Sequence, residues 1–171
     1  MKITYALCIL IFVAGCASSN QPLIPTQEIS APFDVAQASQ QLLPGPNFVK
    51  GNAFMRQRGG GVVTCAGQVV HLIPATPYAK ARFFALYNTN EAGVNIGRNF
   101  RFVPDPPEYY TKTREVKCDS QGNFTFERIA DGDFFVATQV SWQVGNSTEG
   151  GNLMQRVTLS GGQTISLVLA P

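Results

Sequence analysis

The chain has 171 residues and a formal net charge of only +2 at pH 7, from 13 Lys and Arg against 11 Asp and Glu. This near-neutral balance argues against nucleic acid as a partner, because nucleic-acid-binding domains usually carry a basic patch or stripe. Hydrophobic residues make up 44% of the chain, with 12 Phe among them, which favours a packed core over disorder. The length suits a single domain.

The first residues have the pattern of an export signal. Ile3–Val13 is an apolar stretch too short to anchor stably across a bilayer, and it leads into Val13-Ala14-Gly15-Cys16. These four residues resemble the lipobox of bacterial lipoproteins. The resemblance implies that residues 1–15 are a signal peptide that is removed, and that Cys16 is acylated, so that palmitate should label the protein. An ordinary signal peptide with a chance cysteine at the cut is the alternative.

The residues that follow the anchor cysteine bear on its location. Ala17 and Ser18 differ from the aspartate that typically retains lipoproteins at the inner membrane. The resemblance therefore implies a lipid anchor in the outer membrane, on its periplasmic face. Acyl chains on Cys16 would hold the protein at this membrane stably, since two chains already suffice.

Residues 16–46 are expected to hold the domain off the membrane. Asn20–Ala31 is rich in Gln, Pro and Ser and predicts a tether. Asp34 is expected to cap a short helix that ends before Pro44-Gly45-Pro46. These prolines predict a boundary, so the folded domain is expected to span residues 47–171.

Two cysteines remain in the expected mature chain besides Cys16. The periplasm is oxidising, so an even pair there predicts a disulfide between Cys65 and Cys118. Closing a loop of about 50 residues would stabilise the fold by roughly 3–4 kcal/mol. Two buried free thiols are the alternative.

Alternating apolar residues predict strands through most of the remaining chain. Val70 and Leu72 are expected on one face of a strand, with Val69, His71 and Ile73 on the other. The spacing of such segments, with glycine-rich turns between them, predicts an all-β, antiparallel sandwich.

Three further segments follow this pattern. Residues 119–142 predict a turn, a strand, a short link at Asp131–Asp133 and a second strand, which together look like a hairpin. Residues 144–152 predict a loop, and the final segment predicts a hairpin about Gly161-Gly162. Its last strand is expected to face inward at Ile165, Leu167 and Leu169.

The segment from Tyr78 to Thr113 is harder to assign. Its first part, YAKARFFALYNTN, is compatible with helix or strand, because its alanines favour the former and its aromatic residues the latter. A short strand, an extended Pro104–Pro107 segment and a second strand are expected after it. We expect a long excursion between two core strands.

The order of these pieces carries a resemblance. A glycine-led strand at Gly51 is followed by AGQVVHL, by DSQGNFTFERIADGDFFVAT and by VTLSGGQTISLVL. This order resembles the carboxypeptidase regulatory-like domain, a transthyretin-like (prealbumin-like) β-sandwich. The family's characteristic positions are occupied here by Gly122, Phe124, Phe126, Ile129, Gly132, Phe134 and Val136. The resemblance implies a non-catalytic module, without a cofactor, that serves an accessory, adhesive or docking role.

Few residues suggest chemistry. His71 is the single histidine, and with no metal-ligand spacing around it we interpret it as a strand-surface residue. Asp119, Asp131 and Asp133 could gather at one rim and bind Ca²⁺, but aspartates in turns more often bond to local backbone. We therefore expect no metal site and no catalytic residues.

Aromatic residues are the candidates for binding. Tyr109, Tyr110 and Trp142 could stack on sugar rings or anchor a protein partner if they are exposed together; buried, they would belong to the core. The primary hypothesis is a module that docks an envelope protein, with the outer-membrane lipoproteins of type VI secretion systems as one variant by fold analogy. Glycan or peptidoglycan binding is the second hypothesis, and a hydrolase the third.

Overall fold

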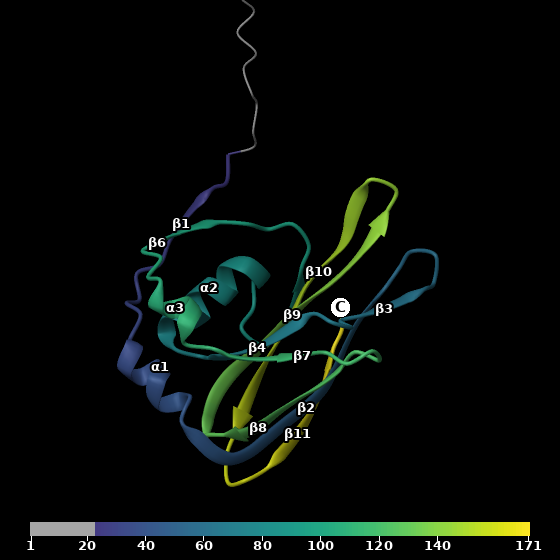
Figure 1. Cartoon of the computed structure of the whole chain (residues 1–171). Helices are drawn as coiled ribbons and strands as arrows, with labels where there is room; N and C mark the ends of the chain where they lie inside the picture. The colour runs from purple at the N-terminus through teal and green to yellow at the C-terminus, as the bar shows by residue number, and fades with distance from the viewer. Residues whose placement is uncertain (1–22) are drawn as a thin grey trace, which may run out of the picture.

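The computed structural model describes residues 23–171, and it shows two packed β-sheets with three short helices on one side (Figure 1). The predicted all-β sandwich is thereby confirmed. The predicted signal peptide and the predicted lipidation site, Cys16, lie outside the described residues. Within residues 23–171, no helix has the length and apolar character needed to cross a membrane.

The elements in chain order are β1 (Thr26–Glu28), α1 (Val35–Gln41), β2 (Pro44–Arg56), β3 (Val62–Thr64), β4 (Val69–Pro74), α2 (Pro77–Tyr87), β5 (Ala92–Asn95), β6 (Arg101–Val103), α3 (Glu108–Thr111), β7 (Arg114–Lys117), β8 (Asn123–Ile129), β9 (Gly132–Val144), β10 (Ser147–Leu159) and β11 (Thr164–Leu169).

One sheet has five strands in the order β5-β10-β9-β4-β7, with neighbouring strands antiparallel. The other is built on β2, which pairs with β11 in parallel and with β3 and β8 antiparallel. β1 and β6 form a small parallel pair beside the helices.

The first core lies between the two sheets. The strand alternation predicted for β4 is confirmed, since Val70 and Leu72 are fully buried in this core. Phe124, Phe126 and Phe134 also lie there, each stabilising the fold by about 1.5–3 kcal/mol through burial. Leu167 and Leu169 of β11 are buried as predicted, and Ile165 packs against them half-buried.

The second core lies on the outer face of the five-stranded sheet, beneath α2. Phe83 stacks on Phe135 of β9 with ring centroids 4.1 Å apart. β9 therefore contributes to both cores, because successive residues of a strand point to opposite faces. Residues of the second core come from seven elements or links: Ile29, Ala75, Tyr78, Ala79, Phe83, Phe102, Tyr109, Phe135 and Met154.

The structure resolves the ambiguous segment 78–113 into two helices, α2 and α3, and two short strands, β5 and β6. α2 begins where Thr76 Oγ1 accepts a hydrogen bond from Ala79 N–H at 3.2 Å, with Pro77 in the first turn, and it ends at Asn88, which has a left-handed φ of 59°. These capping residues favour a helix where periodicity alone was ambiguous. The expectation of a strand directly after Pro107 was wrong, because α3 precedes β7.

The predicted boundary at Pro44-Gly45-Pro46 was also wrong. β2 begins at Pro44, and the ladder with β8 has irregular register between Pro44 and Val49. Prolines are tolerated at the start of a strand and at bulges, where no ladder donor is required. The short helix α1 is confirmed, with Asp34 accepting from Gln37 N–H at 2.9 Å.

The tether prediction fails for the part of Asn20–Ala31 that the structure describes. Thr26–Glu28 pairs with β6, and Ile29 is only 5% exposed within the second core. The segment is short of large apolar residues, but the burial of Ile29 and the pairing of β1 with β6 hold it against the domain.

Both predicted hairpins of the C-terminal half differ from the structure. β8 and β9 belong to different sheets, and so do β10 and β11. Instead, β9 pairs with β10 along its whole length, so residues 144–152 form the turn and strand of a long hairpin rather than a loop. Gly150, with φ of 124°, lies so close to the Val140 carbonyl that a side chain would collide with it.

The predicted disulfide is confirmed. Cys65 and Cys118 are bonded, with Cα atoms 5.8 Å apart and a sequence separation of 53. Backbone hydrogen bonds flank the bridge, since Cys118 N–H donates to the Gln68 carbonyl and Gly67 N–H donates to the Cys118 carbonyl. The disulfide therefore fixes the link from β3 to β4 against the link from β7 to β8.

Candidate functional site

A cleft of about 810 Å³ opens between α2, the 95–99 loop and the outer face of the five-stranded sheet. We call it the α2 cleft. Its lining residues are Gln68, Val69, His71, Phe83, Leu86, Tyr87, Asn95, Gly97, Arg98, Asn99, Ala137, Thr138, Gln139 and Asn152. Amide side chains are the most frequent polar groups among them.

Sheet register brings several of these amides into a row. Gln139 on β9 lies directly opposite Asn152 on β10, and Asn152 lies opposite Asn95 on β5. Residues paired in this way point to the same face of a sheet. The strands therefore place three amides side by side on the face that the α2 cleft exposes.

Asn95 has a separate role, because it shapes the rim. Its Oδ1 accepts from Arg98 N–H at 2.8 Å, and its Nδ2 donates to the Arg98 carbonyl at 2.9 Å. Asn95 is only 5% exposed, whereas Arg98 is exposed. The buried amide thus fixes the turn that presents the Arg98 side chain at the mouth of the cleft.

The remaining amides are free to bind. Gln139, Asn152 and Asn99 are exposed and Gln68 is half-buried, and within residues 23–171 no protein hydrogen bond engages their side chains. Tyr87 stands among them, and burial raises the pKa of its hydroxyl, which therefore stays protonated at neutral pH. The cleft offers donors and acceptors together, with an aromatic ring beside them.

The charge of the cleft is low. Arg98 and His71 are the basic residues among those lining it, and none of the lining residues carries a carboxylate. Glu115 approaches from outside the lining, with its Oε1 3.2 Å from His71 Nδ1. This composition suits an uncharged ligand that forms hydrogen bonds.

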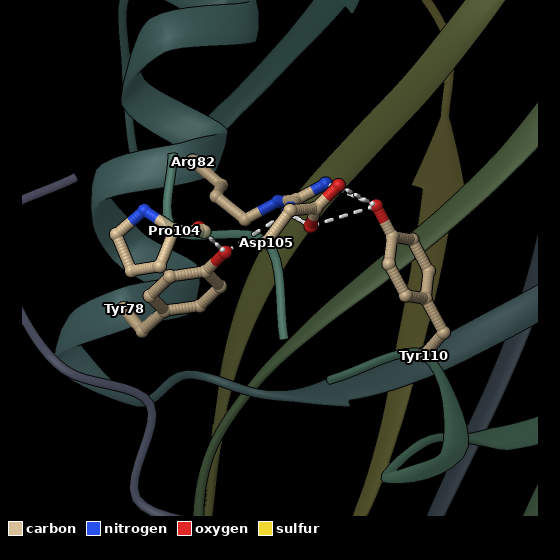
Figure 2. A network of polar contacts seen from close by, with 5 residues as sticks. All are labelled: Tyr78, Arg82, Pro104, Asp105 and Tyr110. Carbon is tan, nitrogen blue, oxygen red and sulfur yellow. Dashed lines mark hydrogen bonds and ion pairs between the residues drawn. The ribbon is translucent and has the colours of Figure 1, made fainter. Parts of the chain in front are cut away.

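Figure 2 shows a second polar cluster, centred on Arg82 of α2. The guanidinium donates to Tyr78 OH at 3.1 Å and to Tyr110 OH at 2.9 Å, and it forms an ion pair with Asp105. Tyr110 OH also donates to the Asp105 carboxylate, and Tyr78 OH donates to the Pro104 carbonyl at 2.7 Å. These bonds attach α2 to the 104–110 segment.

Aromatic rings surround the same guanidinium. Its carbon lies 4.0 Å from the centroid of Phe102 and 4.6 Å from that of Tyr109. Burial lowers the pKa of Arg82, but the hydrogen bonds that its guanidinium donates to Tyr78, Asp105 and Tyr110 outweigh this effect and raise the pKa, so the charge is permanent. Arg82 is 7% exposed, and its contacts are internal. We therefore assign this cluster to stability rather than to ligand binding.

The structure does not bring the three predicted aromatic residues together. Tyr109 is 8% exposed and packs edge-on against Tyr78, so it is a core residue. Tyr110 is 56% exposed but bonded to Asp105 and Arg82. Trp142 is half-buried in a different cavity, of about 640 Å³, between the β2–β3 and β9–β10 hairpins.

The three predicted calcium candidates are also apart. Asp119 accepts from the N–H groups of Gln121 and Asn123, which lowers its pKa, and Asp133 bonds to Arg156 and Thr158. Asp131 accepts from a buried asparagine, Asn47. In the part of the chain described, no three His, Cys, Asp or Glu side chains converge as metal ligands. His71 lies half-exposed on β4, as predicted.

Comparisons with known proteins support the fold. No family model and no curated protein matches the sequence. The crystal structure of a "putative carbohydrate binding protein" from Pseudomonas aeruginosa matches with a TM-score of 0.65 at 24% identity, over 82% of this chain and 99% of that one. Chlorocatechol 1,2-dioxygenase from Pseudomonas putida matches with a TM-score of 0.30 at 13% identity, over 90% of this chain and 68% of that one. The first likeness shows a shared fold, and the second is too distant to support an argument.

Proposed function

We propose that this protein is a non-catalytic binding module that holds a glycan in the α2 cleft. The observation that carries the proposal is the set of unengaged amides, Gln68, Asn99, Gln139 and Asn152, around Tyr87. An amide both donates and accepts hydrogen bonds, as a sugar hydroxyl does, so the two groups match in pairs. An aromatic ring adds an apolar surface for the C–H face of a sugar.

Two further points support a glycan. The structural neighbour from Pseudomonas aeruginosa, which shares the fold, is described by its name as carbohydrate-binding. The cleft also lacks the usual machinery of sugar hydrolysis, which needs a pair of carboxylates across the scissile bond. None of the cleft's lining residues supplies one. Binding without cleavage is therefore the activity that the geometry favours.

The test is binding of the full chain to an array of glycans and to purified peptidoglycan. The double variant Gln139→Ala, Asn152→Ala removes two facing amides from exposed positions and should lower affinity by roughly five- to 150-fold, since each lost hydrogen bond is worth about 0.5–1.5 kcal/mol. Val168→Ala, 62% exposed on β11, is the matched control. Equal binding by the double variant and the control would contradict the assignment of the cleft.

Protein docking is a second candidate, favoured by a separate observation. Ile96 and Val144 are 69% and 54% exposed beside Trp142, at the open end between the two long hairpins. Such a cluster is typical of a protein contact. If it docks an envelope protein, Val144→Asp should abolish cross-linking to that partner in cells and leave glycan binding unchanged.

We further propose that the module is a carboxypeptidase regulatory-like lipoprotein, anchored in the outer membrane through Cys16. The residues Val13-Ala14-Gly15-Cys16 support this, together with the β-sandwich that follows them. Palmitate labelling of the cells should mark the wild-type protein and not Cys16→Ser. Labelling of both, or of neither, would contradict the anchor.

A further inference from the structure

A second cleft, of about 440 Å³, lies between α2 and β1. We call it the β1 cleft. Its lining residues are Gln27, Glu28, Ile29, Ser30, Ala81, Phe84, Ala85, Asn88, Arg98 and Phe100. Polar groups from β1 form one side, and the apolar face of α2 forms the other.

The two clefts lie on opposite sides of one helix. Phe83 and Tyr87 line the α2 cleft, whereas Ala81 and Ala85 line the β1 cleft. At 3.6 residues per turn these two pairs of positions point in nearly opposite directions. A ligand that occupies both clefts therefore has to pass over the exposed face of α2 or around one of its ends.

Arg98 lines both clefts, and it marks the place where they meet. Its guanidinium donates to the side chain of Asn88, the residue that ends α2. The turn that carries Arg98 is held by the buried Asn95, as described above. At the C-terminal end of α2, where the two clefts meet, hydrogen bonds from Asn95 therefore hold the backbone of the turn. This turn presents the exposed, positively charged side chain of Arg98.

The β1 cleft has an exposed aromatic surface, which is the feature least developed in the α2 cleft. Phe84 is 56% exposed and faces the cleft together with the half-buried Phe100. Gln27 and Glu28 offer hydrogen-bonding groups opposite them. Aromatic faces flanked by such groups are suited to sugar rings, which are apolar on their C–H faces and polar at their edges.

We propose that the α2 cleft and the β1 cleft are two subsites of one extended site, which binds a polysaccharide chain around the C-terminal end of α2. This inference rests on the proposed function and narrows it, from glycans in general to chains several sugars long. In the α2 cleft, hydrogen bonds to the amides hold one part of the polysaccharide. Arg98 contacts the middle of the polysaccharide, and Phe84 stacks on a sugar ring in the β1 cleft.

The test compares disaccharides with hexasaccharides of the malto-, cello- and chito- series, titrated into the full chain by calorimetry. The hexasaccharide of the series that binds should bind at least tenfold more tightly than its disaccharide. Phe84→Ala should weaken the hexasaccharide by roughly two- to tenfold, the worth of one aromatic contact, and leave the disaccharide unchanged. Gln139→Ala with Asn152→Ala should weaken both, and Val168→Ala neither.

The outcomes separate the two proposals. If Phe84→Ala binds the hexasaccharide as wild type does, or if it weakens the disaccharide equally, the extended site is overturned and the α2 cleft alone remains. If no sugar of any series binds, the proposed function itself fails. Because Phe84 is more than half exposed, the variant should retain the wild-type circular dichroism spectrum and unfolding midpoint.

Discussion

Asn47 Nδ2 donates a hydrogen bond of 2.8 Å to Asp131 Oδ1, a residue 84 positions away in the chain. The same amide nitrogen donates to the Ile129 carbonyl at 2.9 Å, and its oxygen accepts from the N–H groups of Gly162 and Gln163. Asn47 is fully buried, and every one of its bonds is to a different segment from its own. One side chain therefore connects β2 with two of the links that cross between the sheets, the β8–β9 link and the β10–β11 link.

Asn47→Ala should lower the free energy of unfolding by roughly 2–4 kcal/mol, because it leaves several buried backbone groups without partners. Urea unfolding followed by circular dichroism measures this. Asn52→Ala on the same strand is the control, since Asn52 is half-buried and also makes two amide hydrogen bonds, but these bonds are exposed, and it should cost less than about 1 kcal/mol. Equal effects of the two variants would contradict the role assigned to Asn47.

Arg82→Ala should destabilise the protein by about 3–5 kcal/mol, the usual result of removing one partner of a buried ion pair. Arg82→Lys should recover only part of this loss, because an ammonium group cannot donate in the planar geometry that Tyr78 and Tyr110 require. Thermal unfolding with Arg101→Ala, at an exposed position on β6, as control measures both. Full recovery by lysine would show that charge alone matters there.

Replacing Cys65 and Cys118 together with alanine should lower the free energy of unfolding by about 4 kcal/mol in the chain-entropy treatment of a loop this long. Reduction of the wild-type protein should have a similar effect in urea titrations, whereas the double variant should not respond to reductant. Labelling of both thiols in the native, unreduced protein would contradict the disulfide.

Asp133 should make stability depend on acid pH. Hydrogen bonds from Thr158 and Arg156 lower the pKa of its carboxyl below the unfolded value of about 3.9. A lowered pKa means that the stabilisation is present above pH 4 and is lost as the pH falls through the folded value. Asp133→Asn should therefore cost about 1–2 kcal/mol at pH 7 and progressively less below pH 4.

Unfolding in urea at pH 7, 5 and 3 checks this dependence. Glu127→Gln, at an exposed position on β8, is the control and should follow the wild-type curve. A constant difference between wild type and Asp133→Asn at all three values would show that the ionised carboxylate contributes nothing.

The two faces of β9 could be predicted from sequence because strand periodicity is local. Phe134 and Val136 point into the first core, and Phe135 and Ala137 point toward α2, as their alternation indicated. The same periodicity does not show which strands pair with one another. The β8 and β11 patterns fit a hairpin as well as a crossing to the other sheet, and the contacts that hold these crossings, such as the hydrogen bonds of Asn47, join residues remote in sequence.

The candidate site was harder to predict than the fold. Gln139 and Asn152 are polar residues on strands, and each one alone looks like an ordinary surface position. Only the register of β9 with β10 makes them neighbours. Arg82 carried no local signal either, because its aromatic surroundings come from Phe102 and Tyr109, which follow it by some twenty residues. Tyr109 was predicted as a binding residue because it is aromatic, but in the structure it belongs to the core.

The parallel pairing of β2 with β11 has a consequence for how the protein is made. Phe48 pairs with Thr164, and Ala53 pairs with Leu169. The central strand β2 therefore cannot pair with β11 until the ribosome has added more than a hundred further residues. Such distant contacts slow folding. A nascent chain should consequently remain protease-sensitive until residues 164–169 have left the ribosome, and then become resistant in one step.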